Sequence, residues 1–199
     1  MSKLSNFVIP AAIFQAVALA QSTEETRYYI NGVFVEHNRI TATNGHILIR
    51  YEIETGLNEG ESAIVYVDKG EKGFKSKVSS ELIMAFDPNK KIVEFYDGDT
   101  DTRRLSVCGF DVIDGTFPDA SRVIPDHSKS SGLNHFGINP DFLSIFGKAD
   151  KILSRNRTSA VSFTLGESAA EPVLVHIGGQ YEHKGKVTGV IMPLRSAYI

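Results

Sequence analysis

The side chains of this 199-residue chain that could do chemistry are six histidines, one cysteine and 24 acidic residues. They would support metal binding or acid–base catalysis only if they stood at the short, regular spacings that these sites need. The histidines are scattered, and no two have the spacing of metal ligands on a helix: His37, His46, His127, His135, His176 and His183. The sequence therefore predicts no metal site and no cofactor.

Other catalytic patterns are also missing. Asp97, Asp99 and Asp101 alternate as in a calcium loop, but no glutamate follows at the required position, so a solvated hairpin tip is expected. The single cysteine, Cys108, excludes an internal disulfide and fits a buried strand position. The chain has no phosphate-binding Gly-x-x-x-x-Gly-Lys, no dinucleotide fingerprint and no Gly-x-Ser-x-Gly elbow. We expect a protein that is not an enzyme.

Composition is that of a globular protein with a local rather than a global charge pattern. Hydrophobic residues make up 42% of the chain, charged residues 23%, and the net charge is −3. A chain without a bulk positive charge can contact nucleic acid only through a local basic patch. We expect a cytoplasmic protein without a membrane contact, because no segment reaches the ~18 uninterrupted apolar residues of a span.

Residues 1–20 leave two interpretations open. One basic residue, an apolar run and the sequence Ala18-Leu19-Ala20 are typical of an export signal. Pro10 and Gln15 interrupt that run, and the apolar side chains after Pro10 recur at helical spacings of three and four. We expect a packed helix here, with an exported protein, even an enzyme, as the alternative.

The elements that would position any site repeat one order three times: a short strand, a helix, then three strands. The expected ranges are 7–9, 11–21, 27–36, 39–42 and 46–51 in the first segment, and 63–67, 78–86, 91–96, 103–109 and 110–113 in the second. In the third they are 135–138, a helix from Pro140 to near Lys151 with Asn139 as its N-cap, 160–165, 172–177 and 186–193. The pattern predicts an α+β fold built of βαβββ repeats, with antiparallel sheets on the outside and helices on one face.

Four strings carry a resemblance to a known family. Residues 27–33 read Arg-Tyr-Tyr-Ile-Asn-Gly-Val and residues 41–48 read Thr-Ala-Thr-Asn-Gly-His-Ile-Leu. Residues 113–125 read Ile-Asp-Gly-Thr-Phe-Pro-Asp-Ala-Ser-Arg-Val-Ile-Pro, and residues 190–195 read Val-Ile-Met-Pro-Leu-Arg. The first two together resemble the middle domain of the bacterial DNA polymerase III β subunit, the sliding clamp. The others resemble the segment closing that domain and the clamp's C-terminal strand, in the same order along the chain.

The resemblance implies a domain division and a function. Residues 1–125 would form a clamp domain like the family's middle domain, and residues 126–199 half of a domain like its last one. Clamps are processivity factors that bind linear peptides of DNA polymerases and other partners, and they encircle duplex DNA without reading its sequence. The unpaired third segment predicts a homo-oligomer, a dimer or tetramer. A clamp loader remains a possible further partner.

The resemblance also implies site residues. The peptide-binding positions that match are Thr43, Gly45, His46, Leu48, Pro118, Arg122, Val123, Val190, Met192, Pro193 and Leu194. A concave apolar patch of this composition suits an anchoring Leu or Phe. DNA-facing positions would be Lys72, Lys75, Lys77, Lys148, Lys151, Arg155 and Arg157. Ile47 and Asn44 stand where clamps have arginine and aspartate, so the partner's consensus would differ.

Simpler interpretations stay open for single residues. Met192 and Leu194 could belong to the core, His46 could cap a turn, and Arg122 could form a surface ion pair. A second function also stays open: a clamp-fold interaction module that competes for clamp-binding peptides without encircling DNA.

Overall fold

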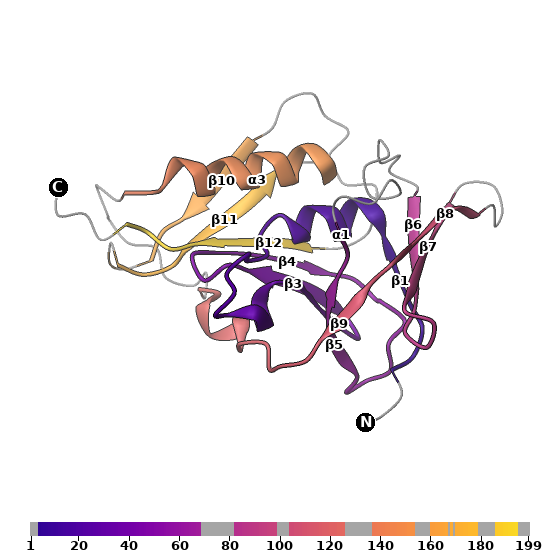
Figure 1. The fold of residues 1–199 in the computed structure, drawn as a ribbon. Helices are drawn as coiled ribbons and strands as arrows, with labels where there is room; N and C mark the ends of the chain where they lie inside the picture. The colour runs from indigo at the N-terminus through magenta and orange to yellow at the C-terminus, as the bar shows by residue number, and fades with distance from the viewer. Residues whose placement is uncertain are drawn as a thin grey trace.

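The computed structural model describes residues 4–68, 82–98, 104–125, 137–153, 160–166, 168, 170–178 and 186–194. In this part of the chain, two antiparallel sheets and two α-helices form the fold (Figure 1). One sheet has the strand order β1-β6-β7-β8, and the other has the order β10-β11-β12-β4-β3-β2-β5-β9. The expected α+β class with antiparallel sheets is confirmed.

The smaller sheet contains β1 (Phe7–Pro10), β6 (Leu82–Asp87), β7 (Ile92–Asp97) and β8 (Arg104–Gly109). Its inner face is apolar, and the ring of Phe7 stacks on that of Phe86 with 4.5 Å between centroids. The helix expected over 78–86 is wrong for residues 82–86, which form part of strand β6. Leu82, Met84 and Phe86 are buried while the residues between them are half-buried. This alternation of period two, and pairing with β1 and β7, override the helix propensity of Leu, Met and Ala. Residues 78–81 lie outside the described part.

The first segment supplies α1 (Ala11–Ala18), the 3₁₀ turn η1 (Tyr28–Ile30), β2 (Val33–Glu36), β3 (Arg39–Thr43) and β4 (Ile47–Glu52). The helix ends at Ala18 rather than at Gln21, although i→i−3 hydrogen bonds continue the turn to Gln21. The strand expected over 27–36 begins only at Val33. The 28–30 turn precedes it, closed by a 3.0 Å bond from the amide of Asn31 to the carbonyl of Tyr28.

The remaining elements are β5 (Ser62–Tyr66), β9 (Asp111–Ile113), the 3₁₀ turn η2 (Ala120–Val123), α3 (Pro140–Leu153), β10 (Ala160–Thr164), β11 (Val173–Gly178) and β12 (Lys186–Ile191). The expected cap of α3 is confirmed, because the amide of Asp141 donates a 2.9 Å hydrogen bond to Asn139 Oδ1. Of the strand expected over 135–138, the described part shows one bridge, between Gly137 and Leu194.

Strand β12 joins the third segment directly to the first. It pairs with β4 in an antiparallel register that runs from Lys186 opposite Glu52 to Ile191 opposite Ile47. Helix α3 packs against α1 on the same side of this sheet (Figure 1). The sheet is therefore continuous across the expected domain boundary at residue 126, which itself lies outside the described residues.

Both faces of the large sheet are covered. The helices and the inward side chains form the main core, which also takes in β1 and β6. A second apolar cluster covers the opposite face; its buried members are Ile30, Leu48, Ile64, Phe117, Ala120, Leu174 and Val190. For this reason β4 is buried at every position except Glu52.

The N-terminal segment is part of this core. Phe7, Ile9, Ile13 and Phe14 are each at most 1% exposed, so cleavage after Ala20 would remove β1 and α1 from the interior. The export-signal interpretation does not account for this packing. No helix among the described residues is long and apolar enough to cross a membrane.

Candidate binding pocket

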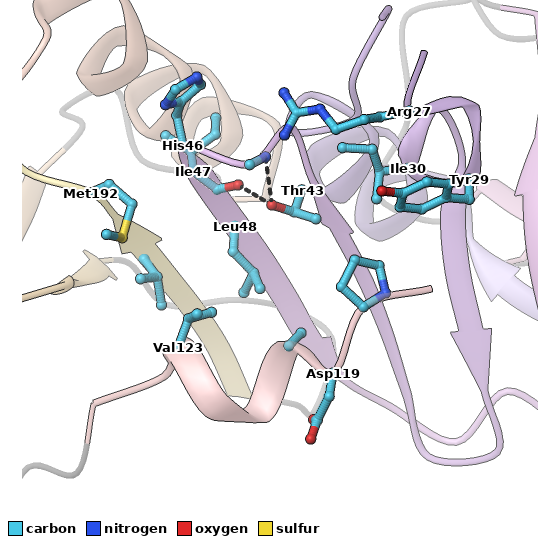
Figure 2. Close-up of a pocket in the computed structure, with 14 residues that line it drawn as sticks. Arg27, Tyr29, Ile30, Thr43, His46, Ile47, Leu48, Asp119, Val123 and Met192 are labelled. Carbon is cyan, nitrogen blue, oxygen red and sulfur yellow. Dashed lines mark hydrogen bonds between the residues drawn. The ribbon is translucent and has the colours of Figure 1, made fainter. Parts of the chain in front are cut away.

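A cavity of about 180 Å³ opens where β4 meets the end of β12, on the sheet face opposite the helices. Figure 2 shows its walls: the β3–β4 turn, η1, η2 and the end of β12. Its lining residues are Arg27, Tyr29, Ile30, Thr43, Gly45, His46, Ile47, Leu48, Pro118, Asp119, Ala120, Val123, Val190 and Met192. Most of them are apolar.

The β3–β4 turn is held by its own polar side chains. Thr43 Oγ1 donates to the carbonyl of Ile47 at 2.7 Å and accepts from the amide of Gly45 at 3.1 Å (Figure 2). Asn44 Oδ1 accepts from the amides of His46 and Ile47, each at 3.0 Å. An asparagine thus fixes this turn through the same oxygen that an aspartate would use. Gly45 has a φ of +89°, which side chains with a Cβ rarely adopt.

The end of β12 forms the facing wall. The amide of Met192 donates a 2.8 Å hydrogen bond to the carbonyl of His46, which extends the β12–β4 pairing by one step beyond Ile191. Val190 lies opposite Leu48 in the same register, and both are nearly fully buried at the floor. Met192 remains 36% exposed and borders the opening.

Residues 117–123 form the third wall. Phe117 anchors them, since its ring stacks on Phe34 at 4.8 Å and 6°. Asp119 accepts hydrogen bonds from the amide of Ser121 and from Nε of Arg122, both at 3.1 Å. This turn places Pro118, Ala120 and Val123 against the cavity.

Two polar groups stand at the rim. Arg27 donates from Nε and Nη2 to the carboxylate of Glu24 at 2.8 and 2.7 Å, which raises the pKa of Arg27 and lowers that of Glu24. The ring of His46 stacks on Phe142 in α3, with 5.2 Å between centroids. An apolar floor with a few polar rim groups suits the burial of one or two apolar side chains of a peptide.

The structure brings together eight of the eleven residues expected to bind peptide: Thr43, Gly45, His46, Leu48, Pro118, Val123, Val190 and Met192. Arg122, Pro193 and Leu194 do not line the cavity. Arg122 is 84% exposed in its side chain and pairs with Asp119, the surface ion pair that the sequence left open. Past Met192 the chain turns toward Gly137, whose carbonyl accepts from the amide of Leu194 at 2.8 Å, so these residues leave the pocket.

Six lining residues were not among the expected ones: Arg27, Tyr29, Ile30, Ile47, Asp119 and Ala120. All six lie inside the strings that carry the family resemblance. The signal was therefore present, but nothing in the strings distinguishes side chains that point into the pocket from those that do not.

The residues expected to face DNA are only partly described. Lys148 and Lys151 are exposed on α3. Lys72, Lys75, Lys77, Arg155 and Arg157 lie outside the described residues, as do Asp99 and Asp101 of the expected hairpin tip. Within the described ranges, no three His, Cys, Asp or Glu side chains are grouped so that they could hold a metal ion.

Comparison with known proteins gives one curated relative and a set of solved structures. No family model matches the chain. The beta sliding clamp of Vibrio cholerae is 25% identical over 126 residues, which cover 60% of this chain and 32% of the relative. The chain thus matches about a third of that protein's length.

The solved structures are sliding clamps. That of Bacillus subtilis aligns with 98% of this chain and 66% of its own, at a TM-score of 0.54 and 18% identity. The clamps of Pseudomonas aeruginosa and Bartonella birtlesii, both bound to griselimycin, have TM-scores of 0.55 and 0.53 and identities of 17% and 20%. Each alignment covers 96% of this chain and 66% of the other. The chain therefore has the fold of the bacterial DNA polymerase III β sliding clamps, over a shorter length, and resembles one of them in sequence.

Proposed function

We propose that this protein is a processivity factor of the sliding-clamp type, which holds linear peptides of a DNA polymerase and of other partners. The observation that carries this proposal is the apolar pocket between the β3–β4 turn and the end of β12. It has a continuous apolar floor at Leu48 and Val190, and Met192 borders the opening. Such a pocket gains affinity from a few buried anchors, so short peptides with Leu or Phe suffice.

The placement of the helices supports a DNA-facing side. Helices α1 and α3 cover the sheet face opposite the pocket, and Lys148 and Lys151 are exposed on α3. Cations on such a face would contact phosphates without reading bases. A partner held in the pocket and a duplex under the helices would then lie on opposite sides of one sheet.

Self-association would complete the ring that this role needs. The third segment pairs with the first through β12 and β4, and α3 packs on α1, but under the division that we propose at residue 126 it is still only half of a clamp-type domain. Strands β8 and β10 are end strands of their sheets in the described part, and exposed edges favour pairing with another chain. We propose a dimer or tetramer. Sedimentation that shows only monomer at micromolar concentration would contradict this part.

The test of the pocket is capture of a fluorescent peptide with Leu and Phe anchors, followed by anisotropy. Wild type should bind with micromolar affinity, and the double variant His46→Ala with Met192→Ala should lose binding while keeping its circular dichroism spectrum. Unchanged affinity in a folded double variant would show that the peptide site lies elsewhere.

A second candidate function is favoured by α1. Seven of its eight residues are buried, and it carries no basic side chain. This helix therefore has no cation that could contact a DNA phosphate. Its composition favours an interaction module that binds clamp-binding peptides without encircling DNA. Retention on nicked circular DNA with loss from linear DNA would support the ring. Equal behaviour on both would support the module.

A further inference from the structure

Arg50 is a buried cation that the peptide pocket does not use. It lies in the middle of β4, on the same face of the strand as Leu48, and it is 8% exposed. Residues 117–121 cover it, since Nη1 approaches Ser121 Oγ at 3.5 Å. An arginine retains its charge in a protein, so a positive charge is enclosed here.

This charge has no carboxylate partner among the described residues. Its closer hydrogen bond is a neutral one, from Nε to Thr41 Oγ1 at 3.2 Å. Glu36 is held by Arg39 through two bonds of 2.6 and 2.7 Å. A guanidinium has five N–H donors and here has two hydroxyl partners, so most of its donor capacity remains.

Asp119, a second nearby acid, is also occupied. One of its oxygens accepts from the amide of Ser121, and the other accepts from Arg122. Glu36 and Asp119 are thus each held in an ion pair with another arginine, and Glu52 acts on Arg50 through its charge without an ion pair among the described residues. Burial, followed by the charge of Arg39, lowers the pKa of Arg50, and the charges of Glu36, Glu52 and Asp119 offset this only in part.

A cavity of about 120 Å³ lies beside Arg50. The stacked rings of Phe34 and Phe117 border it, as do Arg39 and Ser121. By this measure one water needs roughly 10–15 Å³, so the space admits a carboxylate group with its donors around it. Pro118, Asp119 and Ala120 line both this cavity and the peptide pocket, so a single stretch of chain separates the two.

We propose that this cavity is a carboxylate site, in which Arg50 binds an acidic side chain that flanks the apolar anchors of the bound peptide. The inference rests on the proposed peptide-binding function and adds the charge of the partner. A carboxylate would meet Arg50 by charge-assisted hydrogen bonds and would accept from Ser121 Oγ. Glu36 and Asp119 also border the cavity, and their ion pairs limit the repulsion.

The experiment compares matched peptides by fluorescence anisotropy. Each pair has the same Leu and Phe anchors and differs only by Glu or Gln at one flanking position, with each flanking position tried in turn. For wild type, one Glu peptide should bind roughly tenfold to a hundredfold more tightly than its Gln partner, as expected for a charge-assisted bond. In Arg50→Gln this ratio should fall to near one. Arg104→Gln, an exposed arginine of the other sheet, is the control and should keep the wild-type ratio.

A variant less disruptive than Arg50→Gln, and a measurement without peptide, also test the carboxylate site. Ser121→Ala removes one hydroxyl from an exposed position and should reduce the ratio partly, even if Arg50→Gln does not fold. Sodium formate, compared with sodium chloride at equal ionic strength, should raise the melting temperature of wild type more than that of Arg50→Gln.

The failures are distinguishable. Equal binding of all Glu and Gln peptides to wild type overturns the carboxylate site and leaves the peptide pocket standing. Suppose that Glu and Gln peptides bind equally but formate raises the melting temperature only when Arg50 is present. The cavity then binds free carboxylates, and the proposal that it binds an acidic side chain of the peptide is overturned. If neither peptide binds, the proposed function fails as well.

Discussion

The amide of Met192 lies 2.8 Å from the carbonyl oxygen of His46 and donates a hydrogen bond to it. These residues are 146 positions apart by their numbers, yet they close the two sides of one pocket. The bond continues the β12–β4 ladder, so the pocket exists only while the third segment remains paired with the first. A peptide that binds as we propose would therefore stabilise this junction, because a ligand that binds only the joined form favours that form.

Gly45 tests how far the rim of the pocket depends on Arg27. A Cβ at Gly45 would lie 2.5 Å from Arg27 Nη1, and its φ of +89° adds strain of roughly 1–2 kcal/mol. We expect Gly45→Ala to lower both the unfolding free energy, measured by urea denaturation, and the affinity for peptide. Gly60→Ala is the matched control, since its φ is +84° and nothing lies within 4 Å of the added carbon. It should lose similar stability and keep its affinity. Equal affinities in the two variants would disprove the role of Arg27 at the rim.

Lys148 and Lys151 test the DNA-facing side. Replacing both by glutamine should weaken binding to duplexes of unrelated sequence to the same extent. The slope of log K against log salt should become shallower by about one for each phosphate that the protein no longer neutralises. Lys186→Gln is the control, because Lys186 lies on β12 on the side of the pocket, in register with Arg39 and Glu52. If the control weakens DNA binding as much as the double variant, the helix face is not the DNA face.

The buried carboxylate of Asp150 in α3 should lower the stability of the fold. It is 1% exposed, and neither carboxylate oxygen has a hydrogen-bond partner among the described residues. Asp150→Asn should raise the unfolding free energy at neutral pH by about 1 kcal/mol, since a buried charge without a partner is unfavourable. Asp141→Asn, in the exposed first turn of the same helix, should lower it by about 0.5 kcal/mol through loss of the dipole interaction. The same sign for both changes would contradict this assignment.

Glu94 gives a prediction about acid stability. Arg104 donates to it at 2.7 Å and Tyr96 at 2.8 Å, and these bonds lower the pKa of Glu94 below its ordinary value of 4.5. A lowered folded-state pKa stabilises the fold above pH 4.5, and that contribution disappears as the pH falls through the folded-state value. The urea concentration at which half of the wild-type protein is unfolded should therefore decrease as the pH is lowered below 4.5. The same midpoint should decrease less for Glu94→Gln. Glu59→Gln, at an exposed position, should behave as wild type does.

Local patterns predicted most elements, and tertiary packing decided the exceptions. The cap at Asn139 and the strands after it follow from local chemistry, so they were predictable. Residues 82–86 include helix-forming side chains, but they form a strand because they pair with β1 on one side and with β7 on the other. Strand β4 shows no alternation, because η1 and η2 cover the face that a simpler sheet would leave to solvent.

The candidate site depended on resemblance rather than on pattern. Thr43, Gly45 and Met192 could be identified because the strings containing them resemble a known pocket. Arg122 failed as a lining residue because its partner, Asp119, holds it at the surface. Arg50 was not identified, since a charged residue within an apolar strand gives no indication of which segment covers it.

Methionine methyl NMR tests most directly whether the pocket at the β4–β12 junction binds peptide. The protein is labelled with ¹³C-methyl methionine and titrated with a peptide that carries Leu and Phe anchors. Met192 borders the pocket, whereas Met84 is buried in β6 of the other sheet and serves as an internal control. We predict a saturable shift of the Met192 methyl signal with no change at Met84. A Met192 signal that stays in place while anisotropy reports a bound peptide would contradict the assignment of this pocket.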